Sequence, residues 1–175
     1  MSNSVLHPEI AHQKTAIESV TIRPIRPADI AMEAEFIRNL SVETKHYRFL
    51  GGVNELSPAE LKRLCDVDGR HSMAFVATVK EDGHEKEIGV SRYAEYPGND
   101  AGELAITIAD SWQHKGLGEL LLKRLITYAK NHGVKQLYSV ELADNTAMRD
   151  LAKALGMSAR RDPDDANQVI YSLTL

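Results

Sequence analysis

The stretch GELAITIADSWQHKGLGELLL, residues 102–122, decides the prediction of the fold. Its first seven residues alternate as a strand does, with Leu104, Ile106 and Ile108 on one face. Glu103 lies on the opposite face, at the start of this strand. Leu117, Leu120 and Leu121, followed by Leu125, recur at helical spacing and are expected on one apolar face. The stretch therefore predicts a strand, a short loop and a helix in succession.

The loop QHKGLG, residues 113–118, has the character of an anion-binding turn. A helix N-terminus offers free backbone N–H donors and about half a positive charge. Gly116 and Gly118 carry no Cβ, so a phosphate can approach the backbone closely. His114 and Lys115 add donors at the rim. The loop therefore predicts a pyrophosphate site at the start of the helix.

Two other phosphate-binding loops do not fit this sequence. The dinucleotide-binding fingerprint needs a third glycine at the position where this chain has Leu121. A Walker A loop needs Gly-Lys-Ser or Gly-Lys-Thr after four intervening residues, and residues 113–118 do not provide it. Taken alone, the two glycines are also compatible with a plain structural turn between a strand and a helix.

Apolar periodicity and turn residues predict one mixed α/β domain over residues 20–175, preceded by a flexible leader over residues 1–19. A central sheet of six or seven strands, antiparallel in its first half, is expected between layers of helices. The sequence Ser57-Pro58-Ala59-Glu60 has the form of a capping box. Strands are expected at residues 20–26, 73–79, 87–93, 102–108, 136–142 and 169–173, helices from residues 27, 41, 57, 116 and 145, and a turn at residues 97–100.

The composition excludes several classes of protein. With 175 residues, of which 43% are hydrophobic, the chain has enough material for one folded core. The net charge of −4 argues against a basic surface that binds nucleic acid. The sequence contains no run of about 18 apolar residues, so no membrane span is expected. Residues 1–19 lack the apolar stretch of a secretory signal, so a cytoplasmic protein is expected.

Neither metal binding nor thiol chemistry is expected from the sequence. The single cysteine, Cys65, cannot form an internal disulfide, and its setting predicts an inert thiol on one side of a short helix. His46, His71 and His84 lack the spacing of metal ligands. The sequence therefore predicts no metal site.

Residues 103–122 resemble the acetyl-CoA motif of the GNAT family of N-acetyltransferases. The family pattern Gln/Arg-x-x-Gly-x-Gly/Ala is matched at every fixed position by residues 113–118. The second half agrees as well, because Asn145 opens the next predicted helix and Leu155-Gly156-Met157 ends it. The resemblance covers residues 20–174 and implies the GNAT fold.

A narrower resemblance concerns the first third of the chain. Residues 21–27, 35–41 and 47–49 look like the acetyltransferase domain of bacterial protein lysine acetyltransferases. Those domains are often fused to larger modules, so the likeness does not define a substrate. The acceptor implied is an amine, on either a protein lysine or a small molecule, and no nucleic acid or membrane partner is expected. A homodimer, through the sheet edge or the last strand, stays open.

The resemblance implies that a primary amine attacks acetyl-CoA directly within a ternary complex. Glu103 matches the glutamate proposed as general base in the lysine-acetylating branch, and an ammonium must lose a proton before it can attack. A backbone N–H of Ile106 or Ile108 would stabilise the charge on the thioester oxygen. The residues implied in binding acetyl-CoA are Ile106, Ile108, Gln113, His114, Lys115, Gly116, Leu117, Gly118 and Asn145.

Three features leave alternatives open. Ala152 stands where many family members have a tyrosine that protonates the leaving thiolate, so Tyr93, water or no acid at all would serve here. Asn145 fits a helix N-cap as well as a cofactor ligand. A non-catalytic sensor of acyl-CoA is the alternative to an enzyme, and the presence of Glu103 favours the enzyme.

Overall fold

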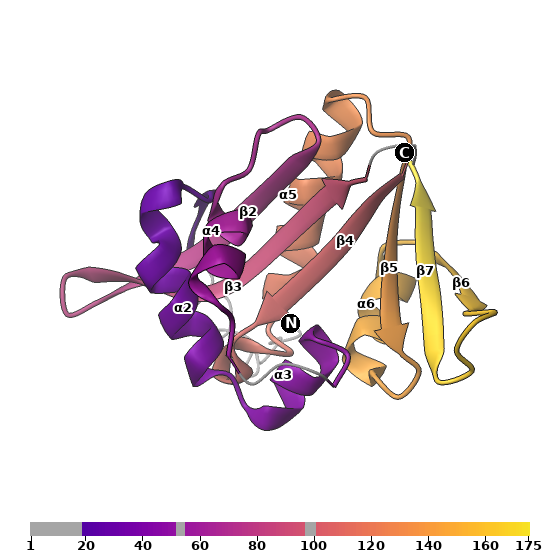
Figure 1. Ribbon diagram of the computed structural model, residues 1–175, viewed down its shortest axis with the longest axis horizontal. Coiled ribbons are helices and arrows are strands. Elements are labelled where there is room, and N and C mark those ends of the chain that lie inside the picture. The colour runs from indigo at the N-terminus through magenta and orange to yellow at the C-terminus, as the bar shows by residue number, and fades with distance from the viewer. Residues whose placement is uncertain (1–18, 52–54, 97–100) are drawn as a thin grey trace, which may run out of the picture.

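The computed structural model describes residues 19–51, 55–96 and 101–175. In this part of the chain seven strands form one sheet in the order β1-β2-β3-β4-β5-β7-β6 (Figure 1). The mixed α/β architecture and the number of strands confirm the prediction. The expected leader, apart from Ser19, and the expected turn at residues 97–100 lie outside the described residues.

The elements follow the predicted order, with one additional short strand near the C-terminus. None of the described helices is both long and apolar enough to cross a membrane. The strands are β1 (Thr21–Pro24), β2 (Ser72–Glu81), β3 (His84–Glu95), β4 (Ala101–Ile108), β5 (Gln136–Leu142), β6 (Ser158–Arg161) and β7 (Gln168–Thr174). The helices are η1 (Pro27–Asp29), α2 (Ile30–Asn39), α3 (Val42–Arg48), α4 (Pro58–Cys65), η2 (Asp110–Trp112), α5 (Leu117–Asn131) and α6 (Thr146–Ala154).

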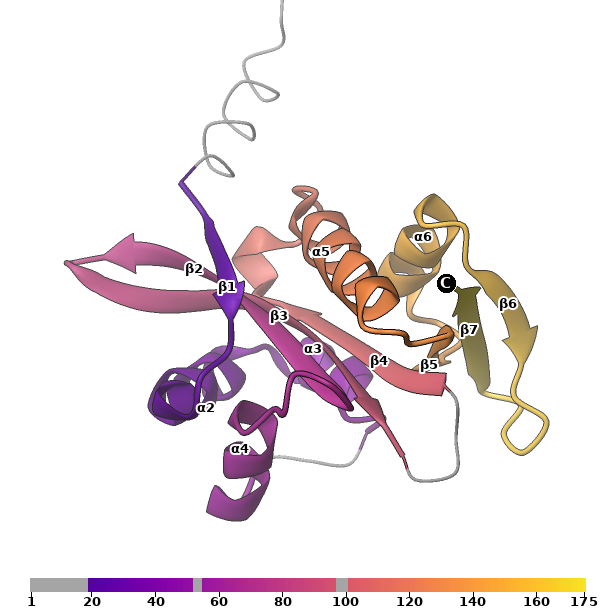
Figure 2. The ribbon, with the colours of Figure 1, turned by 90° about the horizontal axis from the view of Figure 1, so that it is seen from above.

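Helices cover both faces of the sheet (Figure 2). On one face α5 and α6 pack over the larger apolar cluster, which includes Phe75, Leu104 and Leu137. On the other face α2 and α4 pack over a smaller cluster around Phe36 and Val76. The sheet therefore has an apolar core on each side, as the three-layer arrangement requires.

The apolar face of α5 differs in one residue from the expected one. Leu117, Leu121 and Leu125 are buried, as their spacing predicts, but Leu120 is 42% exposed. Leu122 is fully buried in its place. At about 100° per residue, the buried leucines cluster on one side of the helix and Leu120 points away from it. Grouping Leu120 with the core was therefore wrong.

The start and end of α4 follow the sequence signals closely. Ser57 accepts a hydrogen bond from the backbone N–H of Glu60, and the Glu60 carboxylate accepts one from the backbone N–H of Ser57. This reciprocal pair confirms the capping box. At the other end Cys65 is fully buried, and burial raises the pKa of its thiol to about 12. Cys65 is thus an inert thiol, as predicted.

Ionisable side chains are buried between α2 and the sheet. Glu33 is 1% exposed, and its Oε1 lies 2.5 Å from Nη2 of Arg92. Arg92 also donates to the carbonyl of Leu64, so it joins β3 to both α2 and α4. Glu87 is 3% exposed, and no described residue donates a hydrogen bond to either of its carboxylate oxygens. Burial, together with the charge of Glu33, raises the pKa of Glu87 to about 10.

We predict that the Glu87→Gln variant is less sensitive to alkaline pH than the wild type. Folded Glu87 keeps its proton where the unfolded carboxyl group loses it, so wild-type stability falls as pH rises from about 4.5 towards 10. Glutamine mimics the protonated side chain and removes this dependence. Melting temperatures measured between pH 5 and pH 9 would reveal this difference in pH dependence. Each kcal/mol of lost stability lowers the melting temperature by about 2–4 °C.

The control for this measurement is Glu35→Gln, which removes a carboxylate from the exposed side of α2. Its melting temperatures should follow the wild type at every pH. Parallel pH profiles for Glu87→Gln and the wild type would contradict the prediction, because they would mean that Glu87 releases its proton equally easily in both states.

Candidate functional site

The sheet opens between β4 and β5. These parallel strands pair only from Ala101 to Glu103 on β4 and from Gln136 to Tyr138 on β5. Beyond Glu103 and Tyr138 no pairing continues, and the two strands diverge (Figure 1). Each strand keeps its other neighbour, β3 for β4 and β7 for β5. The divergence leaves the facing backbone edges of β4 and β5 without a partner strand.

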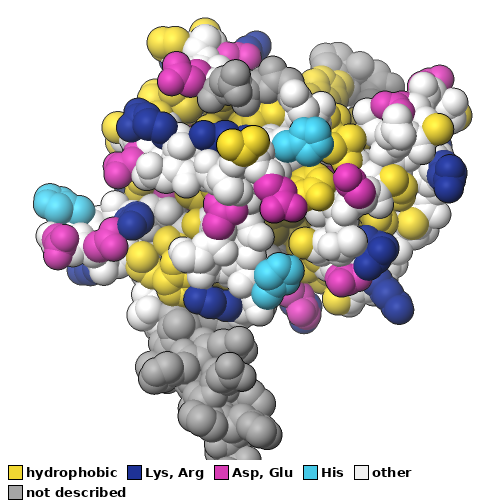
Figure 3. All heavy atoms as spheres, turned by 90° about the horizontal axis from the view of Figure 1, so that it is seen from below, with side chains coloured by type: hydrophobic (Ala, Val, Ile, Leu, Met, Phe, Trp, Pro, Cys, Tyr) yellow, Lys and Arg dark blue, Asp and Glu magenta, His cyan; other side chains and the backbone are white. Residues whose placement is uncertain are grey.

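A cleft of about 680 Å³ lies at this opening. Residues of α3, β4, the following loop, the start of α5, β5 and α6 line it. Hydrophobic side chains lie among acidic and histidine side chains on the face of the molecule seen from below (Figure 3). The cleft is large enough for an organic ligand and carries both apolar and charged walls.

The predicted anion-binding loop forms one end of the cleft. Gly116 is the N-cap of α5 and has a φ of +84°, in the left-handed region that favours glycine. No side chain caps this helix, in contrast to α3, α4 and α6, which Ser41, Ser57 and Asn145 cap. The first intrahelical bond runs from the N–H of Leu120 to Gly116, so the preceding N–H groups have no partner within the helix.

Gly118 leaves room at this end of the cleft. A Cβ built at this position would make ordinary contacts, the nearest at 3.4 Å from Leu151, and the backbone is not in the left-handed region. Neither backbone geometry nor internal packing therefore requires glycine here. Gly118 lines the cleft beside the free N–H groups, which is the arrangement that a phosphate group needs.

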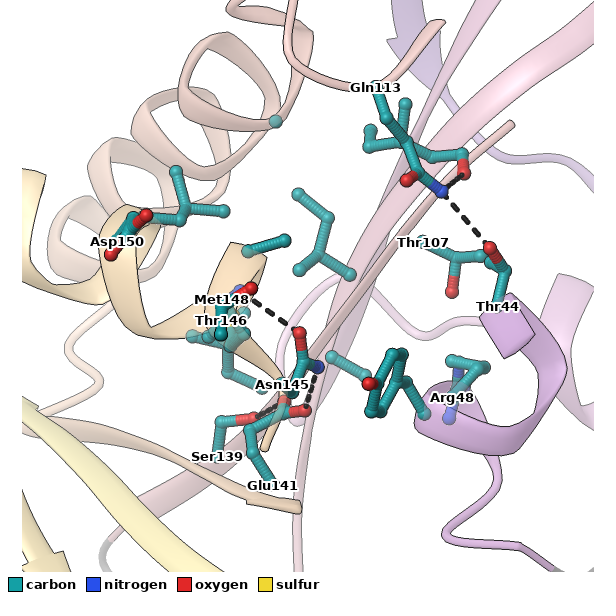
Figure 4. Close-up of a pocket in the computed structure, with 18 of the residues that line it drawn as sticks. Thr44, Arg48, Thr107, Gln113, Ser139, Glu141, Asn145, Thr146, Met148 and Asp150 are labelled. Carbon is teal, nitrogen blue, oxygen red and sulfur yellow. Dashed lines mark hydrogen bonds between the residues drawn. The ribbon is translucent and has the colours of Figure 1, made fainter. Parts of the chain in front are cut away.

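The side chain of Gln113 holds the loop of residues 113–118 in place through two hydrogen bonds. Its Nε2 donates to Oγ1 of Thr44 at 3.0 Å and to the carbonyl of Ile108 at 3.1 Å (Figure 4). Both bonds are internal to the protein and join the loop to α3 and to the end of β4. The side chain that matches the family motif therefore fixes the shape of the loop.

Asp110 ties the same region to the start of α3. Its carboxylate accepts hydrogen bonds from the backbone N–H of Ser41 at 2.9 Å, the Ser41 hydroxyl at 2.6 Å and the Thr44 hydroxyl at 2.7 Å. Burial opposes ionisation, but these bonds outweigh it and lower the pKa of Asp110 below its ordinary value. Since α3 has no buried residue, this carboxylate is a main anchor of the helix.

Asn145 serves as the N-cap of α6. Its Oδ1 accepts a hydrogen bond from the N–H of Met148 at 3.1 Å, and its Nδ2 donates to Glu141 at 3.2 Å (Figure 4). Glu141 also accepts a 2.5 Å hydrogen bond from the Ser139 hydroxyl. Burial raises the pKa of Glu141 above its ordinary value, although these two donors work in the opposite direction. Of the two interpretations of Asn145, the helix cap is confirmed.

Glu103 lies where the pairing of β4 with β5 ends, and it lines the cleft. Two tyrosines lie near it. The charge of the Glu103 carboxylate raises the pKa of Tyr96, and it adds to the effect of burial in raising the pKa of Tyr138. Thr107, two alternations further along the same face of β4, has a buried hydroxyl with no partner among the described residues.

The structure brings most of the predicted site residues together, with two exceptions. The Lys115 ammonium lies 5.4 Å from the centre of the Trp112 ring, and Leu117 is 1% exposed within the core. Neither side chain lines the cleft, so the loop would use Leu117 through its backbone alone. The predicted residues that line the cleft are Glu103, Ile106, Ile108, Gln113, His114, Gly116, Gly118 and Asn145.

The structure narrows the choice of the general acid that would protonate the leaving thiolate. Ala152 is 1% exposed and packs in the core. Tyr93 is also 1% exposed, and its hydroxyl donates to the carbonyl of Arg70. It lies outside the cleft, so Tyr93 was a wrong candidate.

Tyr47 and Arg48 of α3 do line the cleft. Sequence reasoning assigned them no role, because a seven-residue helix without an apolar stripe gives no sign of which side faces a ligand.

Metal ligands are not grouped in the described part of the chain. No cluster of three or more His, Cys, Asp or Glu side chains that could hold an ion occurs there. The groups that converge on the cleft are instead backbone N–H donors, carboxylates and one guanidinium.

Comparison with known proteins identifies the family of this fold and cleft. The family described as Acetyltransferase (GNAT) domain matches residues 19–158. Acetyltransferase PA5475 of Pseudomonas aeruginosa is 51% identical over 156 residues, which are 89% of this chain and 84% of that protein. Acetyltransferase Pat of Mycolicibacterium smegmatis is 31% identical over 136 residues, which are 77% of this chain and 40% of that protein.

Solved structures agree on the fold. The GNAT domain of S. lividans PAT superposes with a TM-score of 0.79 at 22% identity, over 89% of this chain and 90% of that one. The yncA protein of Salmonella typhimurium, a putative acetyltransferase solved with its cofactor acetyl-CoA, superposes with a TM-score of 0.71 at 21% identity, over 90% and 94% of the two chains. The chain therefore belongs to the GNAT family of acetyltransferases.

Proposed function

We propose that this protein transfers the acetyl group of acetyl-CoA to a primary amine. The observation that carries the proposal is the placement of two features along one cleft. The uncapped start of α5, with Gly116 and Gly118, lies at one end. Glu103 lies at the other, where β4 leaves β5. One extended ligand could thus place its diphosphate at the start of α5 and its reactive group beside the proton acceptor Glu103.

The N–H groups at the start of α5 would hold the pyrophosphate of acetyl-CoA. His114, in the left-handed region at a φ of +57°, lies beside them at the rim. The pantetheine arm would then run between the diverging strands and pair with the free backbone edge of β4, as an added strand does. This path passes Ile106 and Ile108, whose backbone N–H groups we propose as donors to the thioester oxygen. Asn145, held as a cap, borders the same path.

The transfer itself needs one proton acceptor. We propose that Glu103 takes a proton from the acceptor ammonium, directly or through water, so that the free nitrogen attacks the carbonyl carbon. A C–N bond forms and the C–S bond breaks, and the second proton that the nitrogen loses passes through water to the leaving coenzyme A thiolate. Glu141 is another carboxylate that lines the cleft. Both of its oxygens already accept hydrogen bonds, which suits it to fix Asn145.

The family and the acetyltransferase relatives support a catalytic protein over an acyl-CoA sensor. The acetyl-CoA dependence, the amine acceptor and the role of each residue remain part of this proposal. We propose that the reaction takes place in the cytoplasm, where acetyl-CoA is available.

The first test separates charge from size at the start of α5. We predict that Gly118→Asp weakens binding of acetyl-CoA about tenfold to a hundredfold more than Gly118→Asn does. The two side chains have the same shape, but a carboxylate at about 6 Å from a phosphate costs about 2–3 kcal/mol. Isothermal titration calorimetry at low and high salt measures it, and the difference should shrink as salt is added.

A carboxylate in the first turn of a helix is favourable for the fold, so Gly118→Asp should melt no lower than Gly118→Asn. Equal affinities for acetyl-CoA in these two variants would contradict a phosphate site at the start of α5. Wild-type binding of acetyl-CoA without release of free thiol on any amine would instead indicate the sensor.

The second test compares Glu103 with Glu141, two carboxylates that line the cleft. We predict that Glu103→Gln lowers the turnover number about a hundredfold or more, the range expected for loss of a general base. Its affinity for acetyl-CoA should stay at the wild-type value. Glu141→Gln should keep most of the turnover, because the amide can still accept from Ser139. Release of free thiol at saturating amine measures both.

The dependence of this rate on pH gives a separate control. If Glu103 is the base, its replacement lowers the rate at every pH at which the acceptor amine is largely protonated, whereas Glu141→Gln keeps the wild-type profile. Equal turnover in Glu103→Gln and the wild type would exclude Glu103 as the base. A larger loss in Glu141→Gln than in Glu103→Gln would transfer the role to Glu141.

A further inference from the structure

Arg48 is a cation of the cleft that has no anionic partner. It is the last residue of α3 and lines the cleft between the diverging strands. Figure 4 shows it on the α3 side, across from Glu141 and Asn145. Among the described residues no carboxylate lies within 4.0 Å of its guanidinium and no hydrogen bond satisfies it, although it lies 5.1 Å from the centre of the Phe49 ring.

The other poorly exposed arginines of the sheet are paired. Arg23 contacts Asp29 at 2.7 Å and Glu85 at 2.9 Å, and Arg92 contacts Glu33 at 2.5 Å. A guanidinium with five donors is costly to remove from water without acceptors. Arg48, which is half-buried, therefore differs from these two arginines in leaving its donors to water or to a ligand.

The surroundings of Arg48 also affect its charge. Burial lowers the pKa of Arg48 to about 10, and the charge of Arg92 acts in the same direction. The carboxylates of Glu33, Glu103 and Glu141 act against this shift at longer range. Even at this pKa the side chain stays cationic at neutral pH. It is a fixed positive charge inside a cleft, in a setting where a bound anion would interact strongly.

The position of Arg48 is rigidly set from the start of its helix. Asp110 holds Ser41 and Thr44, so α3 is attached to the end of β4 by three hydrogen bonds. Gln113 adds a fourth through Thr44. The backbone of Arg48 thus has a defined place relative to the segment that follows β4, which a recognition group needs.

We infer that Arg48 binds a carboxylate of the acceptor, and that the acceptor is a primary amine that carries this carboxylate near its reactive nitrogen. The inference rests on the proposed amine acetylation. The cleft has carboxylates, Glu103 and Glu141, for the ammonium end of such a molecule and one guanidinium for its anionic end. An Arg–carboxylate pair is bidentate and directional, so it orients the amine as well as binding it.

Two kinds of acceptor present this chemistry. One is a free amino acid or a similar small amino carboxylate. The other is a protein lysine with an aspartate or glutamate beside it. The test therefore uses both kinds of probe, each in a form with the carboxylate and a form in which a carboxamide replaces it. The two forms differ in charge and hardly in shape.

The first measurement is kcat/KM for a panel of amino acids and their amides, and for lysine peptides with a neighbouring Glu or Gln. The wild type should prefer the carboxylate form of its acceptor by about tenfold to a hundredfold. Arg48→Met should lose this preference through a higher KM for the carboxylate form, with the amide form little affected. Arg160→Met, on the exposed strand β6, is the matched control and should keep the preference.

Binding of acetyl-CoA to Arg48→Met completes the test. Wild-type affinity for acetyl-CoA is expected, because Arg48 is assigned to the acceptor. A weaker affinity would overturn the inference and assign Arg48 to the cofactor. A wild type that uses carboxylate and amide forms equally, or an Arg48→Met variant that keeps the preference, would also overturn it. Failure of the proposed function looks different, since the wild type would then acetylate no amine at all.

Discussion

The divergence of β4 from β5 is the constraint on which the rest of the site depends. β4 pairs with β3 over seven residues, from Gly89 to Glu95, and β5 pairs with β7 over another seven. Among the described residues only three residue pairs join the two halves of the sheet. Each strand is thus fixed by its outer neighbour, and the inner edges can separate without unfolding either half. A continuous ladder would satisfy these edges and leave no space for a ligand between them.

The two ends of the cleft are coupled through the short segment between β4 and α5. Asp110 fixes α3, and Gln113 connects α3 with the carbonyl of Ile108. The same segment leads directly into Gly116 and the free N–H groups of α5. A change in the proposed anion-binding loop would therefore be transmitted to α3, and with it to Arg48. This contiguous network is a physical route by which cofactor and acceptor could affect one another.

Sequence reasoning predicted the fold better than the roles of side chains. Periodicity and capping residues located nearly every element, because these signals are local: Ser57 and Glu60 act within one turn. Gln113 and Asn145 were located correctly within the cleft, but their polar groups turned out to be engaged inside the protein. Such engagement depends on partners far away in sequence, such as Thr44 for Gln113, and no local pattern encodes it.

The same limit explains why Arg48 was given no role and why Tyr93 was wrongly considered as the general acid. Tyr93 lies on a strand, where alternation tells which residues share a face but not which face meets the cleft. Arg48 ends a helix that buries none of its residues. Its importance follows only from the absence of a carboxylate partner in the described fold. A missing interaction of this kind can be seen only when every neighbour is known.

The charges of the cleft also suggest how a product would leave. An acceptor with an ammonium and a carboxylate would enter attracted at both ends, by Glu103 at its ammonium and by Arg48 at its carboxylate. Acetylation converts the ammonium into a neutral amide and removes the first of these attractions. The carboxylate alone then holds the product, in competition with water that can reach the half-buried guanidinium. A cleft that binds a dipolar acceptor at two points thus binds its product at one, which favours release after each transfer.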